Sequence, residues 1–572
     1  MSYLKRINKK LNARFGGRVT ARESDGCLLL EGSLEHWEEI VAAGLMSVQP
    51  RRYDGLVNDI RFTGGEIPPM RLPEQSDSSL EGEAPDVLII GGGIIGCAAA
   101  RECARYDLNI LLVEKEHDVA MQASSRNDGM VHPGVDLLPG QVKRRYNMRG
   151  NRMYDQVCKE LDVPFRRSGQ YLCFLSKKLV LAAWFAQFYY LIFGPRCKFC
   201  GKKVFFSREP NMSPNIRAAL FFPAAGVVSP YGLTIAYAEN AADNGVRISL
   251  DTAVLDMTVV GGRITAVQTN RGTIHPRVVI NAAGVFAEEI ARKANDRFFS
   301  IHPRKGTNTI LDHKAAKRMA TIVSSFGTAS TKKKHTKGGG LVRTIDDNTL
   351  VGPDAVETFC REDFSTCAQN VADVFEKQSL TDPALNIRDA ITYFSGIRAA
   401  TYEEDFVIRK GRRTENIVHA AGIQSPGVTA APAIAADVAK MAAEIVGKTR
   451  IVRKNVSFNP IRKGIVRPNE LSFEERNALI LKDPDYGEIV CRCEQISRGE
   501  VRDSLHRSVP CDTLDGVKRR VRPGMGRCQG GFCGPLVLRI IAAETGTPLE
   551  QIQKNGPGGE LLYGTIKEVR PE

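Results

Sequence analysis

The sequence lacks a run of the roughly 18 to 20 consecutive apolar residues that a bilayer-spanning helix requires, and its N-terminus lacks the apolar core of a secretory signal. We therefore expect a cytoplasmic protein, with peripheral contact to the inner face of the cell membrane left open. Cysteines in a reducing compartment are thiols or metal ligands before they are disulfides. The 14 cysteines therefore matter through their clustering.

The sequence also lacks the signatures of nucleic-acid binding, since it has neither a zinc-finger spacing of Cys and His nor a basic stripe interleaved with aromatic residues. Its 572 residues carry 79 Lys and Arg against 65 Asp and Glu, a formal charge of +14. This excess favours a small anionic substrate, an anionic membrane surface or an acidic redox partner. The composition, 43% hydrophobic and 25% charged, is that of a globular protein of several domains.

Residues 1–63 predict a small α+β module. Six basic residues and no acid lie between Met1 and Thr20, and apolar residues there recur at helical spacing. Such a helix can lie on an anionic membrane, but we favour packing of its apolar stripe on strands near 19–21, 27–30 and 56–62, with another helix near 34–43. Residues 64–85, rich in Pro, Gly, Ser and Glu, predict a linker.

A short apolar run, Val87 to Ile90, leads into a G-x-G-x-x-G motif and an Ala-rich segment, which is the strand, turn and helix of a dinucleotide site. Gly91 permits the tight turn, Gly93 lets a pyrophosphate approach the main chain, and Gly96 lets helix and strand pack closely. A second strand, 109–113, ends at Glu114, which is placed to accept hydrogen bonds from a ribose. The predicted cofactor contacts of this region are Gly91, Gly93, Ile94, Ile95, Gly96 and Glu114.

Four further segments carry a family resemblance. Residues 123–134 (ASSRNDGMVHPG) resemble the flavin-facing loop of the D-amino-acid oxidase and glycerol-3-phosphate dehydrogenase superfamily, and residues 279–284, 394–401 and 419–429 resemble other segments of it. The resemblance implies FAD, bound by a Rossmann-like α/β domain over 86–450 with an antiparallel-sheet substrate cap to which 227–259 and 303–353 contribute. The additional cofactor residues that it implies are Ser124, Ser125, Asn127, Ala283, Gly284, Gly422, Ser425, Gly427, Val428 and Thr429.

Four cysteines cluster near the end of the sequence: Cys491, Cys493, Cys528 and Cys533. Structural zinc favours C-x-x-C pairs, so the C-x-C and C-x-x-x-x-C spacing, amid many glycines, argues for iron and sulfur, with zinc as the alternative. Residues 491–545 are similar to the bacterioferritin-associated-ferredoxin-like (BFD-like) [2Fe-2S] module. We predict a small helical [2Fe-2S] domain over 487–550, after a connecting segment at 451–486 and before a tail at 551–572.

The resemblance also suggests catalytic residues. Arg398, in a segment similar to the family's G-x-R-P-x-T motif, is the candidate for gripping an anionic substrate, because a guanidinium binds phosphate or carboxylate in bidentate fashion. His132 is the candidate base, since a hydroxyl proton must leave as hydride moves to flavin; a purely structural histidine is the alternative. Arg343, Lys305 and Arg126 are weaker candidates for the substrate cation.

Two segments fit more than one interpretation. Residues 179–193 (LVLAAWFAQFYYLIF), with basic flanks, suit a membrane interface and equally suit burial in the cap or against a partner subunit. Cys197 and Cys200 form a lone C-x-x-C for which a packed loop is favoured over a metal site.

The combination of modules predicts a dehydrogenase, because flavin accepts two electrons as a hydride and a [2Fe-2S] centre accepts one at a time. An FAD domain followed by a BFD-like module resembles the catalytic subunits of anaerobic glycerol-3-phosphate dehydrogenases. That resemblance implies oxidation of sn-glycerol 3-phosphate to dihydroxyacetone phosphate, with electrons passing to partner subunits or quinone. The alternatives are a dehydrogenase of a 2-hydroxy acid, such as 2-hydroxyglutarate, or of an amino acid, and an electron-transfer or assembly subunit that oxidises no small molecule.

Overall fold

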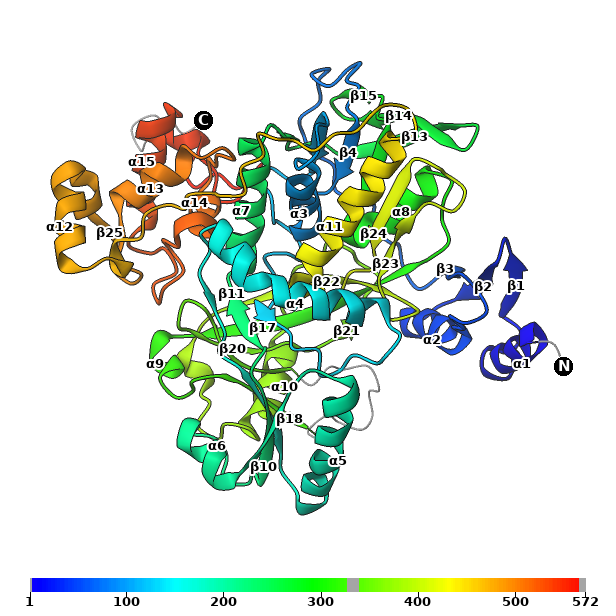
Figure 1. Cartoon of the computed structure of the whole chain (residues 1–572), viewed down its shortest axis with the longest axis horizontal. Coiled ribbons are helices and arrows are strands. Elements are labelled where there is room, and N and C mark those ends of the chain that lie inside the picture. Colours follow the sequence, from blue (N-terminus) through cyan, green and yellow to red (C-terminus); the bar gives the residue numbers. More distant parts are fainter. Residues whose placement is uncertain (1–2, 327–338, 565–572) are drawn as a thin grey trace, which may run out of the picture.

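The computed structural model describes residues 3–326 and 339–564. Its central domain is built on a six-stranded sheet of order β12-β5-β4-β16-β24-β23, which is parallel except for β23 (Figure 1). Its four inner strands are wholly buried and, apart from Asn281 and His419, apolar, as expected for a parallel sheet covered on both faces. The strands are β4 (Val87–Ile90), β5 (Ile110–Val113), β12 (Arg247–Ser249), β16 (Val278–Asn281), β23 (Val407–Lys410) and β24 (Ile417–Ala421).

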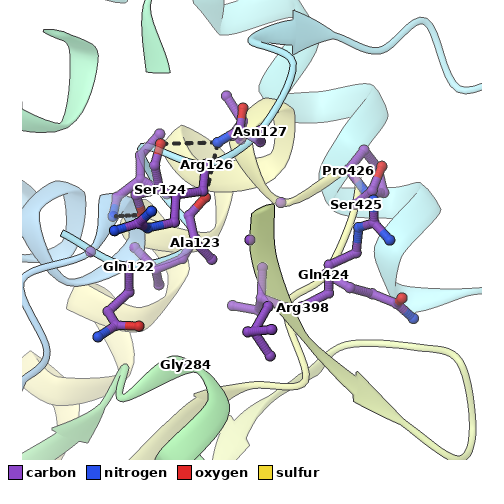
Figure 2. A pocket seen from close by; sticks show the side chains of 18 of the residues that line it. Gln122, Ala123, Ser124, Arg126, Asn127, Gly284, Arg398, Gln424, Ser425 and Pro426 are labelled. Carbon is purple, nitrogen blue, oxygen red and sulfur yellow. Dashed lines mark hydrogen bonds between the residues drawn. The ribbon is translucent and has the colours of Figure 1, made fainter. Parts of the chain in front are cut away.

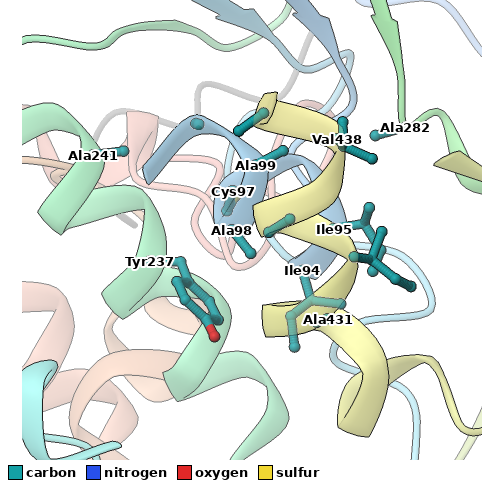
Figure 3. Close-up of a cluster of buried hydrophobic side chains, with 14 of the residues drawn as sticks. Ile94, Ile95, Cys97, Ala98, Ala99, Tyr237, Ala241, Ala282, Ala431 and Val438 are labelled. Atoms are coloured by element: carbon teal, nitrogen blue, oxygen red, sulfur yellow. The ribbon is translucent and has the colours of Figure 1, made fainter. Parts of the chain in front are cut away.

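Helices rich in alanine pack on this sheet. In the core shown in Figure 3, Cys97, Ala98 and Ala99 face Ala431 and Val438, and Tyr237 and Ala241 close the other side. Small side chains let the helices approach closely, which brings the N-termini of α3 and α11 to the edge where the parallel strands end. The helices of this layer are α3 (Ile94–Cys103), α4 (Val142–Glu160), α7 (Pro230–Asp243) and α11 (Gly427–Val446), whereas α8 (Ala287–Lys293) packs on the opposite face of the sheet.

The cap is a nine-stranded sheet within the described residues, of order β21-β17-β20-β19-β18-β8-β10-β9, with β22 also paired to β17. Every pairing is antiparallel except that of β18 with β8. Its strands are β8 (Gln170–Phe174), β9 (Lys198–Gly201), β10 (Ala218–Phe222), β17 (Ile301–Leu311), β18 (Ile322–Phe326), β19 (Gly340–Arg343), β20 (Thr349–Gly352), β21 (Val356–Glu357) and β22 (Ala390–Thr401). Its helices are α5 (Lys177–Phe193), α6 (Lys202–Arg208), α9 (His313–Ala316) and α10 (Ala368–Ser379).

One expectation about the cap is wrong. Residues 303–353 supply cap strands, but 227–259 belong to the central domain, because α7 packs on α3 and β12 extends the parallel sheet. The cap instead takes strands from 170–222 and from β22. The remaining strands form two small sheets: β6 (Met130–Val131), β7 (Phe165–Arg166) and β11 (Gly226–Val228), and β13 (Val254–Val260), β14 (Arg263–Thr269) and β15 (Gly272–Ile274).

The N-terminal module has the predicted elements: α1 (Tyr3–Phe15), β1 (Val19–Ser24), β2 (Cys27–Leu34), α2 (Trp37–Ser47) and β3 (Leu56–Phe62). Ile7, Leu11 and Phe15 of α1 are buried in the module's own core, so the packing interpretation of this helix is confirmed. The second half of the predicted linker is not free chain. Leu80 is buried, and main-chain hydrogen bonds join 77–83 to residues 270–275 beside β15.

The C-terminal region is mainly helical and docks beside α7 (Figure 1). It comprises α12 (Phe473–Lys482), β25 (Ile489–Cys491), β26 (Ile496–Ser497), α13 (Arg498–Leu505), α14 (Leu514–Val521) and α15 (Gly534–Thr545). The predicted tail partly packs on this domain, since Ile552 is buried in its core. Short 3-10 turns complete the chain at Gly284–Phe286, Ile387–Asp389, Pro468–Glu470, Pro484–Gly487 and Leu549–Gln551. Across the ranges that the structure describes, no helix is long and apolar enough to cross a membrane.

Candidate active site and cluster site

A cavity of about 750 Å³ lies between the carboxyl edge of the parallel sheet and the cap. Such an edge is where α/β domains bind dinucleotides, and the volume is in the usual range for ligand sites. The glycine loop, the 122–136 loop and the β16 end form one wall, the start of α11 faces residues 122–127, and the cap strands close the remaining side (Figure 2). Most of the predicted site residues therefore meet around one space.

The glycine loop has little room for side chains. Gly91 has a φ of +111°, a conformation that strains other residues, and a Cβ there would lie 2.6 Å from the carbonyl oxygen of Ala282. A Cβ on Gly96 would lie 1.8 Å from the carbonyl oxygen of Gly91, so the close contact of helix and turn requires glycine. Gly91, Gly93, Ile94 and Ile95 line the cavity, whereas Gly96 lies behind it.

Glu114 stands at the end of β5 with its carboxylate against the glycine loop. It accepts hydrogen bonds from the main-chain nitrogens of Gly92 (2.5 Å) and Glu116 (2.9 Å). Burial raises the pKa of Glu114 to about 7, although these amides oppose the shift. The carboxyl group lines the cavity at the position where a dinucleotide fold presents an acceptor to the ribose.

The 122–134 loop is shaped by its own side chains. Ser124 accepts a hydrogen bond at Oγ from the main-chain nitrogen of Ile94 (2.8 Å), which ties the loop to the first turn of α3. The Asn127 amide donates to the carbonyls of Ala123 and Ser124 (Figure 2). Both side chains line the cavity, but Ser125 does not, and its hydroxyl donates within the turn to Gln122.

The α11 N-terminus supplies the facing wall. Ser425, Gly427 and Val428 line the cavity together with Ala283 and Gly284 from the β16 end. Gly422 and Thr429 were also predicted to touch the cofactor but lie outside the lining. Thr429 Oγ1 accepts a hydrogen bond from the main-chain nitrogen of His132 (2.8 Å) and so joins the two walls.

Arg398 reaches the cavity from β22. It lies across the neighbouring strand at Gly306, where a Cβ would be 2.2 Å from the guanidinium, so the missing side chain of Gly306 makes room for it. Both terminal nitrogens donate to the carbonyl oxygen of Asp354 at 3.1 Å. Burial lowers the pKa of Arg398, yet a guanidinium stays protonated in proteins. An anion entering the cavity would find this charge already oriented.

The other cations on the cavity wall already have partners. Lys115 pairs with Glu116 and Glu362, and Arg304 pairs with Glu357 and Glu404. The Arg126 guanidinium stacks 4.1 Å above the ring centroid of Phe364. Among the described residues, Arg398 forms no ion pair with a carboxylate, and this distinguishes it from Lys115 and Arg304.

Two of the weaker substrate candidates are misplaced. Arg343 pairs with Asp347 and Lys305 with Asp363, and neither lines the cavity. Both side chains form ion pairs with carboxylates of the cap. Both assignments are therefore wrong, and Arg398 is retained.

His132 lies on the cavity wall and is half-buried. Its Nε2 is 3.5 Å from Ser425 Oγ, and its carbonyl oxygen accepts hydrogen bonds from Asn147 (3.3 Å) and Asn151 (2.9 Å). The main chain is thus held on both sides, by Thr429 and by these two amides. A fixed main chain with an imidazole facing the cavity suits a group that exchanges a proton with a ligand.

Sequence reasoning missed two amides. The Gln170 Oε1 and Asn308 Oδ1 oxygens are buried and have no hydrogen-bond partner within the described ranges, and both residues line the cavity. Buried acceptors are normally satisfied, and a ligand in the cavity could donate to these covered oxygens only after a shift of neighbouring side chains. Isolated polar residues on cap strands give no pattern in the sequence from which to find them.

The four clustered cysteines form two pairs. Cys493 Sγ and Cys528 Sγ are 3.8 Å apart, and Cys491 is hydrogen-bonded to Cys533. No group of three or more ligand side chains converges on one point among the described residues. Two thiol pairs fit two iron atoms with two thiolates each, the arrangement of a [2Fe-2S] centre.

The surroundings favour a thiolate at one cysteine of each pair, Cys491 and Cys528, while the pKa values of their partners, Cys533 and Cys493, are raised. The pKa of the Cys491 thiol is lowered to about 6, first by its hydrogen bond with Cys533 and then by main-chain amides that include that of Gly524. Amides of Phe532 and Gly530 lower the pKa of Cys528. These amides are available because the loop is rich in glycine, as the sequence predicted. Cys197 and Cys200, by contrast, sit in the cap, and burial raises the pKa of both thiols.

The cluster domain is docked firmly on the central domain. Buried Asp118, four residues after Glu114, pairs with Arg519 and Arg520 of α14, and these pairs hold the pKa of Asp118 at about 2 against the effect of burial. The Tyr231 hydroxyl at the start of α7 contacts Met525 Sδ at 3.3 Å. The cluster loop therefore contacts the first turn of α7 in the central domain.

Comparison with known proteins gives matches to both regions. A family profile described as FAD dependent oxidoreductase matches residues 86–441, and one described as a BFD-like [2Fe-2S] binding domain matches residues 489–543. A glycerol 3-phosphate dehydrogenase of Caloramator mitchellensis is 37% identical over 84% of this chain and 99% of its own length. One subunit of the anaerobic glycerol-3-phosphate dehydrogenase of Escherichia coli K12 is 24% identical over 82% and 91%. The solved structure of a dithionite-reduced L-alpha-glycerophosphate oxidase from Mycoplasma pneumoniae with FAD bound has a TM-score of 0.60 and 26% identity, covering 66% of this chain and 98% of that one.

Proposed function

Because this chain belongs to the FAD-dependent oxidoreductase family and also carries a BFD-like [2Fe-2S] domain, we propose that it oxidises sn-glycerol 3-phosphate to dihydroxyacetone phosphate. The predicted enzyme class and both predicted cofactors are confirmed by the family matches. The substrate is proposed from the relatives and from the cavity. Electrons would leave one at a time through the cysteine site.

The observation that carries the substrate proposal is Arg398. A phosphate is an anion with several acceptor oxygens, and a guanidinium donates two parallel hydrogen bonds to such a group. Arg398 is half-buried on the cavity wall, oriented by the Asp354 carbonyl and without a carboxylate ion pair in the described chain. Lys115 and Arg304 already have carboxylate partners, and the substrate phosphate would be the anionic partner of Arg398.

A triol phosphate carries two free hydroxyls besides its phosphate. Gln170 and Asn308 line the cavity, but their unpartnered oxygens are covered, so a side-chain shift would be needed before either could accept a hydrogen bond from these hydroxyls. His132 Nε2 would take the proton of the hydroxyl under oxidation, passing it toward Ser425 Oγ or solvent. When bound, FAD supplies the hydride acceptor and the [2Fe-2S] cluster supplies a one-electron acceptor.

The glycine loop, Glu114 and the α11 N-terminus would hold the cofactor. Gly91 and Gly93 leave room for a pyrophosphate at the N-terminus of α3, where the helix dipole favours negative charge. Residues Cys491, Cys493, Cys528 and Cys533 would hold the cluster. We further propose that electrons pass to partner subunits and quinone and that the protein works in the cytoplasm at the inner face of the membrane.

Reduction of the bound flavin without oxygen tests the substrate proposal. Glycerol 3-phosphate, 2-hydroxyglutarate and amino acids are added separately to the purified protein, and the visible flavin absorbance is followed. We expect glycerol 3-phosphate to bleach the flavin fastest. Bleaching by a hydroxy acid or an amino acid alone would replace the substrate, and no bleaching by any of them would favour an electron-transfer or assembly role.

A further inference from the structure

Helix α5 has an outer face that is as apolar as its inner face. The inner face, including Val180, Ala183 and Tyr190, packs on β8 and β10 of the cap. The outer face would normally be polar on a water-facing helix. Instead, six large apolar side chains there are 57% to 78% exposed: Leu181, Trp184, Phe185, Phe188, Leu191 and Ile192.

The flanks of α5 carry charge of only one sign. Residues 175–208 contain seven Lys or Arg and no Asp or Glu. None of the seven forms an ion pair with a described residue, whereas most arginines elsewhere on the surface do. The basic residues are Lys177, Lys178, Arg196, Lys198, Lys202, Lys203 and Arg208.

We propose that α5 docks on an anionic lipid surface, with its axis in the plane of the membrane. An interfacial helix combines exposed aromatic and aliphatic residues with basic neighbours that meet lipid phosphates. At 17 residues and about 1.5 Å per residue the helix is shorter than the roughly 30 Å hydrocarbon core. It would therefore lie in the headgroup region, where Trp and Tyr are favoured.

The position of α5 supports this orientation. It lies at the outer end of the cap, far from the cluster domain and from the N-terminal module, so neither obstructs it (Figure 1). The Tyr190 hydroxyl donates to the carbonyl oxygen of Val135 (2.9 Å), and Val135 lines the cavity. Docking through α5 would thus hold the cavity wall close to the membrane.

Docking through α5 rests on the membrane location proposed above. The experiment that tests it measures vesicle binding and does not measure enzyme activity. The protein is mixed with vesicles of phosphatidylcholine, with or without phosphatidylglycerol, and bound protein is separated by flotation. We expect binding to the anionic vesicles that weakens as salt is raised. The variant Phe185→Ser/Phe188→Ser/Ile192→Ser should bind at least about tenfold less, because it removes the apolar area that enters the interface.

A matched control replaces three exposed apolar residues away from the cap, as Val456→Ser/Phe473→Ser/Leu481→Ser, and should bind as the parent does. Trp184 gives a second readout. The chain has two tryptophans, so in a Trp37→Phe background the emission of Trp184 should shift to the blue on adding anionic vesicles. Equal loss in both triple variants would overturn the proposal, as would vesicle binding that neither salt nor the α5 substitutions change.

Light scattering, which measures the oligomeric state, distinguishes lipid docking from covering of α5 by a second copy of this chain. If α5 were covered by a second copy of this chain, the parent would dimerise and the α5 triple variant would be monomeric, with no vesicle binding by either. That result would overturn the lipid proposal. Because glycerol 3-phosphate oxidation is measured separately, failure of docking would leave the proposed reaction standing.

Discussion

Arg398 can occupy the cavity because its neighbour on β17 is Gly306, which has no side chain to exclude it. The family resemblance singled out Arg398, but nothing in the sequence identified Gly306, Gln170 or Asn308. Their roles depend on which residues stand opposite each other in the cap sheet, and the pairing register is set by long-range contacts. Single residues could therefore be predicted where a local motif contained them. They could not be predicted where their role depends on which residues pair across the cap sheet.

Replacing Arg398 tests the anion site. Arg398→Ala should raise KM for glycerol 3-phosphate by at least about 100-fold, because hydrogen bonds to charged groups contribute about 1.5 to 3 kcal/mol each. Arg398→Lys should recover only part of this, since an ammonium cannot donate the paired bonds of a guanidinium. Arg343→Ala, outside the cavity, is the control and should leave KM near the parent value. A KM unchanged in Arg398→Ala would remove this residue from substrate binding.

Replacing His132 tests the proposed base. His132→Ala should slow flavin reduction about 10² to 10⁴-fold, the usual contribution of a positioned base, while the substrate dissociation constant changes little. The backbone bonds to Thr429 and Asn151 do not involve the imidazole, so the wall should keep its shape. Rapid mixing with glycerol 3-phosphate measures both quantities. A weakened affinity at an unchanged rate would show that His132 positions substrate without accepting its proton.

At the scale of elements, the strand, glycine turn and helix at 87–103 were predictable because their constraints are local. Gly96 must be glycine for α3 to meet the turn, and an Ala-rich helix must follow for close packing. The prediction that 227–259 belongs to the cap was wrong because the position of this segment is not set by local constraints. β11 and β12 are only three residues long, and short strands carry too little pattern to say which sheet they join.

The close contact of α3 and the turn predicts the effect of Gly96→Ala. Its Cβ would meet the Gly91 carbonyl oxygen at 1.8 Å, so the main chain must shift, and overpacking of this kind costs about 1 to 3 kcal/mol or more. We expect a lower free energy of unfolding and loss of FAD from the purified protein. The control is Gly201→Ala, where a Cβ meets nothing within 4 Å. Retention of FAD at parental affinity by Gly96→Ala would contradict the proposed geometry of the glycine loop.

At the scale of the whole molecule, the cluster domain and the central domain are held together by buried charge. The sequence predicted both modules but not their contact, because Asp118 and the arginines of α14 are about 400 positions apart in the chain. This contact begins four residues beyond Glu114. It fixes the distance between the cavity and the cysteine site, on which electron transfer between them depends.

Asp118→Asn should loosen this contact. At neutral pH Asp118 is ionised, since its pKa is about 2, and removing its charge leaves Arg520 buried without its partner, at a cost of about 3 to 5 kcal/mol. We expect electron transfer to the cluster to slow more than reduction of the flavin. Asp155→Asn, which breaks an exposed pair with Arg167, should change neither by much. Equal slowing of both steps would mean that the contact supports the whole fold and has no particular role in transfer.

The proposed reaction requires a substrate-reduced flavin in the cavity to pass electrons to iron held by the four cysteines. Mixing oxidised, iron-loaded protein with glycerol 3-phosphate in the absence of oxygen, and following flavin absorbance together with low-temperature electron paramagnetic resonance, tests it directly. We predict loss of flavin absorbance and then the signal of a reduced [2Fe-2S] centre, abolished by Cys493→Ser. Flavin reduction with a permanently silent cluster, or a cysteine site that purifies with zinc, would contradict the account.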